Sequence, residues 1–189
     1  MDESGSRAHA GKAVIELSTH PTPMGELRIA SRKGKVVGLG FLDSWKRIER
    51  HLSRRFPAEE KREGDCHIEA QLQLGAYLSG ELDALNKVPL DAGGTRFQQR
   101  VWAAIRAVPA GQTLRYAELA RAAGSPGAVR AAGTACGANP IGLVIPCHRI
   151  VRADGDLGNY GSGIERKEWL LAHERWYAAD VVATGSGRS

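Results

Sequence analysis

No hydrophobic run in this chain of 189 residues approaches the roughly 18 to 20 residues that cross a bilayer, so a transmembrane helix is excluded. The N-terminal segment MDESGSRAHAGK lacks the apolar centre of a signal peptide. We therefore expect residues 1–12 to be a disordered leader and the protein to be cytoplasmic. The content of hydrophobic residues, 42%, is ordinary for a folded protein, and the length suits one large domain or two small ones that share a core.

Cysteine is scarce: the chain has only Cys66, Cys136 and Cys147. Their odd number and irregular spacing argue against a disulfide framework and predict reduced thiols. Cys66 and His67 are adjacent, but no further metal-ligating residues accompany them, so no metal site is expected.

Acidic residues are fewer than basic ones, with 21 Asp and Glu against 26 Lys and Arg, which gives a formal net charge of +5. Because phosphate contacts supply most sequence-independent affinity for nucleic acids, this excess is compatible with a nucleic-acid partner. The charge alone does not decide the matter, since many basic proteins bind no nucleic acid.

The N-terminal half of the chain has the pattern of a small sheet followed by helices. Apolar residues alternate in short runs over 13–41, which predicts an antiparallel meander. Spacings of three and four residues then predict helices over 44–56 and 68–79, and a short strand follows at 88–90. A Gly-rich break after this strand closes an N-terminal domain, 13–92.

The C-terminal half begins with three predicted helices. Thr95 is a suitable N-cap for a helix over 97–108, whose apolar residues share one face. Two shorter helices are predicted over 113–124 and 126–138, the second made largely of Gly and Ala. The turn between them gives this pair the length of a helix-turn-helix.

An apolar, strand-like stretch at 143–145 comes next, followed by a Gly-rich loop at 153–163. A last helix is predicted from about Glu165 to Trp176. These elements complete a C-terminal domain, 93–178, and we expect residues 179–189 to be a disordered tail.

Cys147 is the candidate for chemistry because it follows an apolar strand and directly precedes His148. A neighbouring imidazole favours the thiolate, which is the reactive form. Glu174 would orient His148 if the last helix packs behind the strand, and carboxylate, imidazole and thiol together activate nucleophiles. The alternative is that Cys147 only packs in the core, as most cysteines do.

Arg130 is the only long side chain between Val129 and Asn139. A helix of small residues can approach a DNA groove closely, which makes Arg130 a candidate for DNA contact, including contact inside the base stack. Alternatively, Arg130 faces solvent or pairs with Glu118.

From about Thr95 to Glu174 the chain resembles the O6-alkylguanine-DNA alkyltransferases, or methylated-DNA–protein-cysteine methyltransferases. Two segments carry the resemblance, TRFQQRVWAAIRAVPAGQTLRYAELARAAGSPGAVRAAGTACGANP and IPCHRIVRADGDLGNYGSGIERKEWLLAHE. Pro-Cys-His-Arg in this context is highly specific. The N-terminal half resembles the family only in its strand and helix layout and in its Pro23-Met24-Gly25 turn.

The resemblance implies an α+β fold, with a ribonuclease-H-like sheet domain and flanking helices followed by a mostly helical domain with a helix-turn-helix DNA-binding motif. It implies DNA repair by irreversible, single-turnover transfer of an alkyl group from O6-alkylguanine, and as a further substrate O4-alkylthymine, to a cysteine. The implied partner of this monomer is double-stranded DNA, with no cofactor, membrane or obligate protein partner. Some members hold a structural zinc, but the first 60 residues here contain no cysteine.

The resemblance assigns chemical roles to five residues. Cys147 matches the alkyl acceptor, and His148 the general base that acts through a water. Glu174 matches the acid that holds His148, and Asn139 the residue that braces the active-site turn. Tyr116 matches the phenol that donates to guanine N3.

The resemblance also assigns contacts to DNA and to the base. Arg130 matches the arginine that fills the space of the extruded nucleotide. Tyr160 and the backbone N–H of Gly161 match the loop over the base, and the carbonyls of Cys147 and Ile150 would accept from its exocyclic amine. The residues expected to contact DNA are Arg130, Tyr116, Ala128, Ala131 and Gly133.

Gly142 stands where some members have Pro, and a smaller residue at the pocket rim would admit larger O6 substituents. Three other functions are alternatives for such a sequence. A lesion sensor of this kind would lack the acceptor cysteine, and a transcription regulator would need base-reading side chains on its second helix. A Cys-His hydrolase would need an oxyanion hole, which the sequence does not show clearly.

Overall fold

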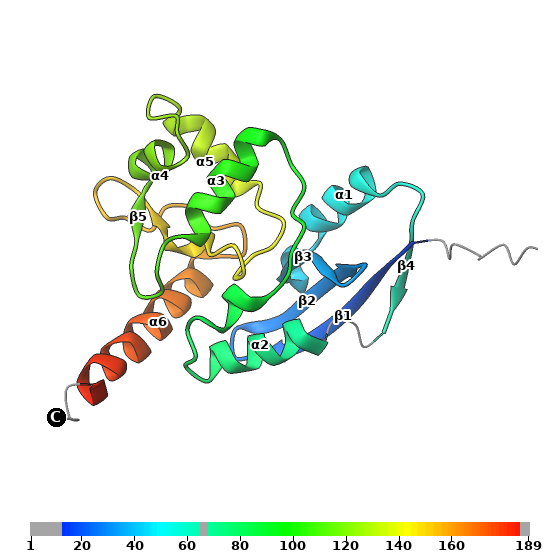
Figure 1. Cartoon of the computed structure of the whole chain (residues 1–189), viewed down its shortest axis with the longest axis horizontal. Coiled ribbons are helices and arrows are strands. Elements are labelled where there is room, and N and C mark those ends of the chain that lie inside the picture. Colours follow the sequence, from blue (N-terminus) through cyan, green and yellow to red (C-terminus); the bar gives the residue numbers. More distant parts are fainter. Residues whose placement is uncertain (1–12, 65–67, 186–189) are drawn as a thin grey trace, which may run out of the picture.

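The structure, a computed structural model, describes residues 13–64 and 68–185. Figure 1 shows a sheet flanked by helices in the N-terminal half and a mainly helical C-terminal half, which makes a mixed α+β fold. The predicted leader and Cys66 lie outside the described residues. Among the helices that the structure describes, none is both long and apolar enough to cross a membrane.

The predicted antiparallel meander is confirmed and forms most of the sheet. It consists of β1 (Val14–Thr22), β2 (Gly25–Arg32) and β3 (Lys35–Phe41), each paired with the next. A fourth strand, β4 (Glu60–Glu63), pairs in parallel with β1 and gives the order β3-β2-β1-β4. β4 was not predicted, because all four of its side chains are charged and its sequence shows no alternation of apolar and polar residues.

A β-bulge in β3 determines which side chains enter the main core. The register between β2 and β3 shifts between Ala30 and Ser31, so that Val37 has no partner across the strand pair. Val36 and Leu39, three residues apart, consequently join the same core cluster, whereas Val37 belongs to the cluster on the other face.

Helices cover both faces of the sheet. α1 (Lys46–Arg55) packs Ile48 and Leu52 against one face. Gly40 permits this close approach, since a Cβ there would lie 2.4 Å from Ile48 Cδ1. α2 (Ile68–Leu78) covers the other face, so both predicted helices are confirmed.

The prediction of a strand at 88–90 is wrong, because this segment forms an isolated bridge and not a strand. Only one bridge forms, between Leu90 and Val36, and the preceding residues Ala84–Lys87 form a 3-10 turn. The segment around Leu90 nevertheless lies along β3, because Val36 N donates to Pro89 O at 2.9 Å and Asp91 N donates to Val36 O at 2.8 Å.

The first helix of the C-terminal half is α3 (Arg96–Arg106), and Thr95 caps it as predicted. Gln98 N donates to Thr95 Oγ1 at 3.2 Å, and Thr95 N donates to Gln98 Oε1 at 2.9 Å, which completes a capping box. Trp102 Nε1 on α3 donates to Ala135 O at 2.8 Å and thereby ties α3 to the small-residue helix.

The two predicted short helices are present but start later than predicted. They are α4 (Tyr116–Ala122) and α5 (Val129–Gly137), and Pro126 lies in the turn between them. Before α4, the two-residue strand β5 (Leu114–Arg115) pairs in parallel with β6 (Ile150–Val151). This pair brings the segment after Cys147 next to the start of α4.

The last helix, α6 (Ile164–Gly185), extends well past the predicted end at Trp176. The prediction of a disordered tail over 179–189 is therefore wrong for its first residues, and 186–189 lie outside the described residues. The mistake arose because the small residues of this region suggested a disordered end.

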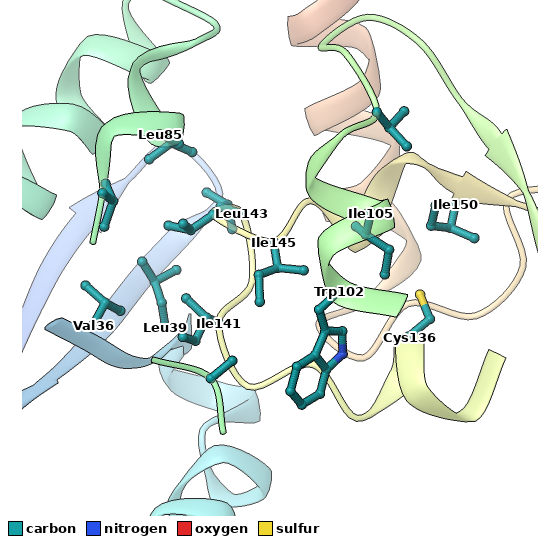
Figure 2. Close-up of a cluster of buried hydrophobic side chains, with 14 of the residues drawn as sticks. Val36, Leu39, Leu85, Trp102, Ile105, Cys136, Ile141, Leu143, Ile145 and Ile150 are labelled. Carbon is teal, nitrogen blue, oxygen red and sulfur yellow. The ribbon is translucent and has the colours of Figure 1, made fainter. Parts of the chain in front are cut away.

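One hydrophobic cluster spans both halves of the chain. Leu39 N donates to Pro140 O at 3.0 Å, and Gly142 N donates to Leu39 O at 2.8 Å, so the segment before Cys147 lies along β3. Figure 2 shows this segment between side chains of the sheet and those of the C-terminal helices. From the sheet side come Val36 and Leu39, from the segment Ile141, Leu143 and Ile145, and from the helices Trp102 and Ile105.

Candidate active site

The candidate nucleophile lies at the end of this buried segment. Cys147 begins η3 (Cys147–Arg149), a single 3-10 turn that follows Pro146. Cys147 is partly exposed, whereas His148 and Arg149 are buried behind it. The turn therefore presents the thiol to a cavity and holds the two following side chains inside the protein.

Asn139 braces the turn through three hydrogen bonds. Its Nδ2 donates to Ile145 O at 2.8 Å and to Cys147 Sγ at 3.2 Å, and its Oδ1 accepts from Ile141 N at 2.9 Å. Only 2% of Asn139 is exposed, so these bonds are shielded from water. The amide thus fixes the segment before Cys147 and donates to its sulfur.

His148 and Glu174 are brought together, as the sequence analysis required. His148 Nε2 lies 2.8 Å from Glu174 Oε1, and both side chains are fully buried. Burial lowers the pKa of His148 and outweighs the opposing effect of the carboxylate, so the imidazole is neutral at pH 7. We assign its proton to Nε2 from the bond to the carboxylate, which leaves the Nδ1 lone pair as the basic site.

Nδ1 of His148 is buried, and no described residue bonds to it. A neutral imidazole whose other nitrogen is committed to a carboxylate can accept a proton at this atom. The arrangement therefore places an atom that can accept a proton on the residue directly after Cys147.

The Glu174 carboxylate also accepts hydrogen bonds from three other residues. Burial alone would raise the pKa of Glu174, but hydrogen bonds from His148 and Arg149 and the positive charge of Arg149 outweigh burial and hold it well below its usual range. Arg149 Nη2 donates to Oε1 at 2.9 Å and Arg149 Nε to Oε2 at 3.0 Å, while Tyr77 Oη donates to Oε1 at 2.9 Å and Gly111 N to Oε2 at 3.0 Å. The carboxylate is consequently ionised and held in one orientation.

The roles of Arg149 and Tyr77 in this network were not predicted from the sequence. Arg149 directly follows Cys147 and His148 in the sequence, and this position was the one available signal for its role. Its Nη1 also donates to Val108 O at 2.6 Å. Tyr77 lies on α2, far from Glu174 in the chain, and no local pattern marked it.

The Cys147 thiol is protonated at rest. Burial raises the pKa of Cys147, and a hydrogen bond from Asn139 and the charges of Arg47 and Lys167 only partly oppose this effect. A neutral thiol is a weak nucleophile, so the site requires a base to remove the proton. Of the cysteines that the structure describes, Cys136 is buried and Cys147 is the more accessible.

A cavity of about 280 Å³ opens in front of Cys147. Predicted residues from three elements line it: Tyr116 on α4, Gly133 on α5, and Tyr160 and Gly161 on the Gly-rich loop. Burial raises the pKa values of both tyrosines, so both phenols keep their protons and can donate hydrogen bonds. The sequence analysis missed other residues that line the cavity, among them Arg47, Cys136, Arg152 and Asn159.

Ile150 does not line the cavity, and its side chain is fully buried. Its carbonyl accepts a hydrogen bond of 2.5 Å from Lys167 Nζ, and the same ammonium donates to Leu157 O. Lys167 is a buried cation that the sequence analysis missed. It ties β6 to the Gly-rich loop.

Arg130 and its neighbours on α5 form a surface beside the cavity. Arg130 and Ala131 are exposed, whereas Ala128 and Gly133 are partly buried. Glu118 caps α4 by accepting from Arg115 N at 2.8 Å, and it forms no ion pair with Arg130 among the described residues. Arg130 therefore faces solvent, which leaves its guanidinium available to a ligand.

The chain is similar to known methylated-DNA–protein-cysteine methyltransferases. The family model of the 6-O-methylguanine DNA methyltransferase DNA-binding domain matches residues 96–176. A methylated-DNA–protein-cysteine methyltransferase from Mycolicibacterium paratuberculosis is 42% identical over 162 residues, which cover 86% of this chain and 93% of that protein. A protein of the same name from Salmonella typhimurium is 49% identical over 102 residues, or 54% of this chain and 60% of that one.

A solved structure shows the same similarity in three dimensions. The crystal structure of Mycobacterium tuberculosis OGT in complex with DNA matches with a TM-score of 0.73 and 39% identity, over 86% of this chain and 94% of that one. The similarity therefore extends over the sheet half as well as the helical half.

Proposed function

The chain belongs to the family of methylated-DNA–protein-cysteine methyltransferases, which repair DNA by direct transfer of an alkyl group to a cysteine, and we propose that Cys147 is the acceptor in this chain. The main support for this proposal is the position of the Cys147 thiol between a cavity and a buried histidine–carboxylate pair. Cys147 faces a cavity, and the fully buried His148–Glu174 pair follows it directly.

The reaction begins with removal of the thiol proton. The proton passes through a water molecule to Nδ1 of His148, and Glu174 stabilises the imidazolium that forms. The Cys147 thiolate attacks the alkyl carbon as the bond from that carbon to O6 of guanine breaks, and the base keeps the electron pair. The Tyr116 hydroxyl donates to N3 of the base as negative charge develops there.

The product is a thioether, which is a poor leaving group. Nothing in the proposed site returns Cys147 to a thiol, so each molecule removes one alkyl group. The bond from Asn139 Nδ2 to Sγ orients the sulfur before attack.

The cavity in front of Cys147 receives the damaged base. Tyr160 and the backbone N–H of Gly161 contact it from the Gly-rich loop, and the Gly161 N–H donates to O6. The carbonyls of Cys147 and Ile150 accept from the exocyclic amine. The Ile150 carbonyl has a second lone pair for this bond beside the one that Lys167 uses.

DNA binds across α4 and α5, which form the helix-turn-helix. Small residues of α5 allow close approach to a groove, and Gly133 leaves room beside the Tyr116 ring, which a Cβ there would meet at 3.7 Å. The damaged nucleotide must leave the duplex, at a cost of a few kcal/mol. Arg130 occupies the space that it vacates, and Tyr116, Ala128 and Ala131 complete the contact.

The sheet half has a ribonuclease-H-like arrangement. The order β3-β2-β1-β4, with an antiparallel meander and β4 parallel to β1, supports this assignment. We propose that the protein acts as a monomer, with the sheet half supporting the segment that carries Cys147.

The number of lesions repaired per protein molecule tests the proposed function. A duplex with O6-methylguanine inside a restriction site becomes cleavable once repaired, and an excess of this duplex is incubated with a known amount of protein. Repair should stop at one lesion per molecule, and Cys147→Ser should repair none. Continued turnover would indicate a hydrolase, whereas tight binding without repair would indicate a lesion sensor.

A further inference from the structure

Arg47 belongs to α1 in the sheet half, yet its side chain reaches the cavity of Cys147. Its Nη2 donates to Asn139 O at 3.0 Å. A Cβ at Gly161 would lie 3.9 Å from Arg47 Nε and Nη2, so the guanidinium also borders the Gly-rich loop. Arg47 thus touches the residue that donates to the nucleophilic sulfur and adjoins the loop over the proposed base site.

No carboxylate pairs with this guanidinium among the described residues. Other arginines that contact the sheet half are neutralised: Arg32 pairs with Glu59, Arg55 with Asp91, and Arg166 on α6 with Asp43. Arg47 instead bonds only to a backbone carbonyl in the described part of the chain. Its positive charge is therefore available to a negative charge in the cavity.

We propose that Arg47 is a positioning residue that stabilises the negative charge of the transfer, first on the Cys147 thiolate and then on O6 of the leaving guanine. The reaction moves one negative charge from sulfur to the base, and the Arg47 guanidinium, which lines the same cavity as Cys147 and borders the Gly-rich loop, attracts this charge. The role toward O6 rests on the proposed function. The role toward the thiolate does not, because it needs only the thiol.

Other charged and titratable groups also face the Cys147 thiol. Lys167 on α6 donates to two carbonyls, and Arg152 lines the cavity from the start of the Gly-rich loop. The titratable neighbours that can also respond to pH are Tyr116 on α4, Cys136 on α5, Tyr160 on the loop, and His148 with Glu174 behind the thiol. A test must therefore remove the charge of Arg47 and leave these groups in place.

The first experiment measures the reactivity of Cys147 toward iodoacetamide as a function of pH, in the full chain, with the labelled peptide identified by mass. Arg47→Gln should raise the midpoint of this profile by about one pH unit and slow labelling at neutral pH roughly tenfold. Arg47→Lys should restore labelling to within about twofold, because it keeps the charge. Arg50→Gln removes an exposed charge from the same helix and should leave the profile unchanged.

A profile of Arg47→Gln that superimposes on the wild-type profile would overturn the proposal. Thermal unfolding checks that each variant is folded, and Arg47→Met, which is also uncharged, replaces the Gln variant if that one is not. Because iodoacetamide contains no guanine, this result is independent of the proposed repair function.

The second experiment measures transfer from free O6-benzylguanine to the same variants. Arg47→Gln should slow this transfer more than it slows iodoacetamide labelling, because the charge on O6 also loses its stabilisation. Equal slowing in the two assays would overturn the role toward O6. A wild-type protein that labels normally but accepts no alkyl group from benzylguanine or from O6-methylguanine in duplex DNA would contradict the proposed function instead.

Discussion

His148 Nε2 and Glu174 Oε1 form a hydrogen bond of 2.8 Å in which neither side chain is exposed. Arg149 neutralises the carboxylate, while burial keeps the imidazole neutral. The carboxylate therefore serves to fix the proton on Nε2, and Nδ1 is left as the base. The predictions that follow depend on this division of roles.

Glu174→Gln should destabilise the protein by about 3–5 kcal/mol, because it leaves Arg149 as a buried cation without its counterion. Alkyl transfer should also fall steeply, since the amide does not fix the tautomer of His148. Urea unfolding and single-turnover kinetics measure the two effects. Glu165→Gln, at an exposed position on the same helix, should change stability by less than about 0.5 kcal/mol. Wild-type stability of the Glu174 variant would contradict the network.

Stability should fall as the pH is lowered from 7. Burial lowers the pKa of His148 in the folded protein, so only the unfolded chain takes up this proton below about pH 6.5. One such proton costs up to about 1.4 kcal/mol per pH unit. The pKa of Glu174 is also lowered, so its contribution is present above about pH 4.5 and declines at lower pH.

The free energy of unfolding measured from pH 7 to 5 tests this effect. His148→Asn removes the group, and its stability should depend less on pH than that of the wild type. His51 is also partly buried with a lowered pKa, but it is unchanged in both proteins and cancels in the comparison. Equal slopes for the two proteins would show that folding does not shift the pKa of His148, which would contradict a buried, neutral imidazole.

Local patterns predicted the elements with regular apolar spacing. The meander and α1, α2 and α3 appear where alternation or helical spacing placed them, and Thr95 forms the predicted capping box. β4 was missed because a charged edge strand has no apolar face. The end of α6 was misplaced because small residues gave no signal for continuing the helix.

The candidate site was predictable only in part, because local sequence patterns do not show which distant residues pack together. Adjacency in the chain joined Cys147 to His148, and the position of Glu174 on the last predicted helix made it a candidate partner of His148. The family resemblance supplied Asn139 and Tyr116. Arg47 comes to the site from the sheet half through tertiary packing. No sequence spacing encodes such a contact, so only the folded chain reveals it.

Arg130→Ala should reduce repair of O6-methylguanine in duplex DNA by roughly tenfold or more, since part of the flipping cost is no longer offset. Transfer from free O6-benzylguanine should change little, because no base leaves a stack. Arg175→Ala removes an exposed charge on α6 and controls for net charge. Equal losses on both substrates would show that Arg130 does not act in flipping.

Gly142→Pro should destabilise the protein by about 1–3 kcal/mol, even though some family members have Pro at this position. Gly142 N donates to Leu39 O at 2.8 Å, and Pro has no N–H to replace this bond. The ring would also narrow the cavity, so transfer from O6-benzylguanine should fall more than transfer from O6-methylguanine.

Gly142→Ala separates the two effects. It keeps the N–H and adds a Cβ that would lie 3.4 Å from Leu39 O, so it should be less destabilising than Pro. Denaturation midpoints and the ratio of rates on the two substrates provide the comparison. A Pro variant as stable as the wild type would mean that the bond to Leu39 contributes nothing.

The most direct measurement is the intact mass of the protein after incubation with duplex DNA that contains one O6-methylguanine, followed by peptide mapping. The account predicts a stoichiometric gain of about 14 Da, the mass change when a thiol becomes its methyl thioether, located on Cys147 and absent from Cys147→Ala. An unchanged mass despite loss of the lesion, or a methyl group on another residue, would contradict the assignment of Cys147 as the acceptor.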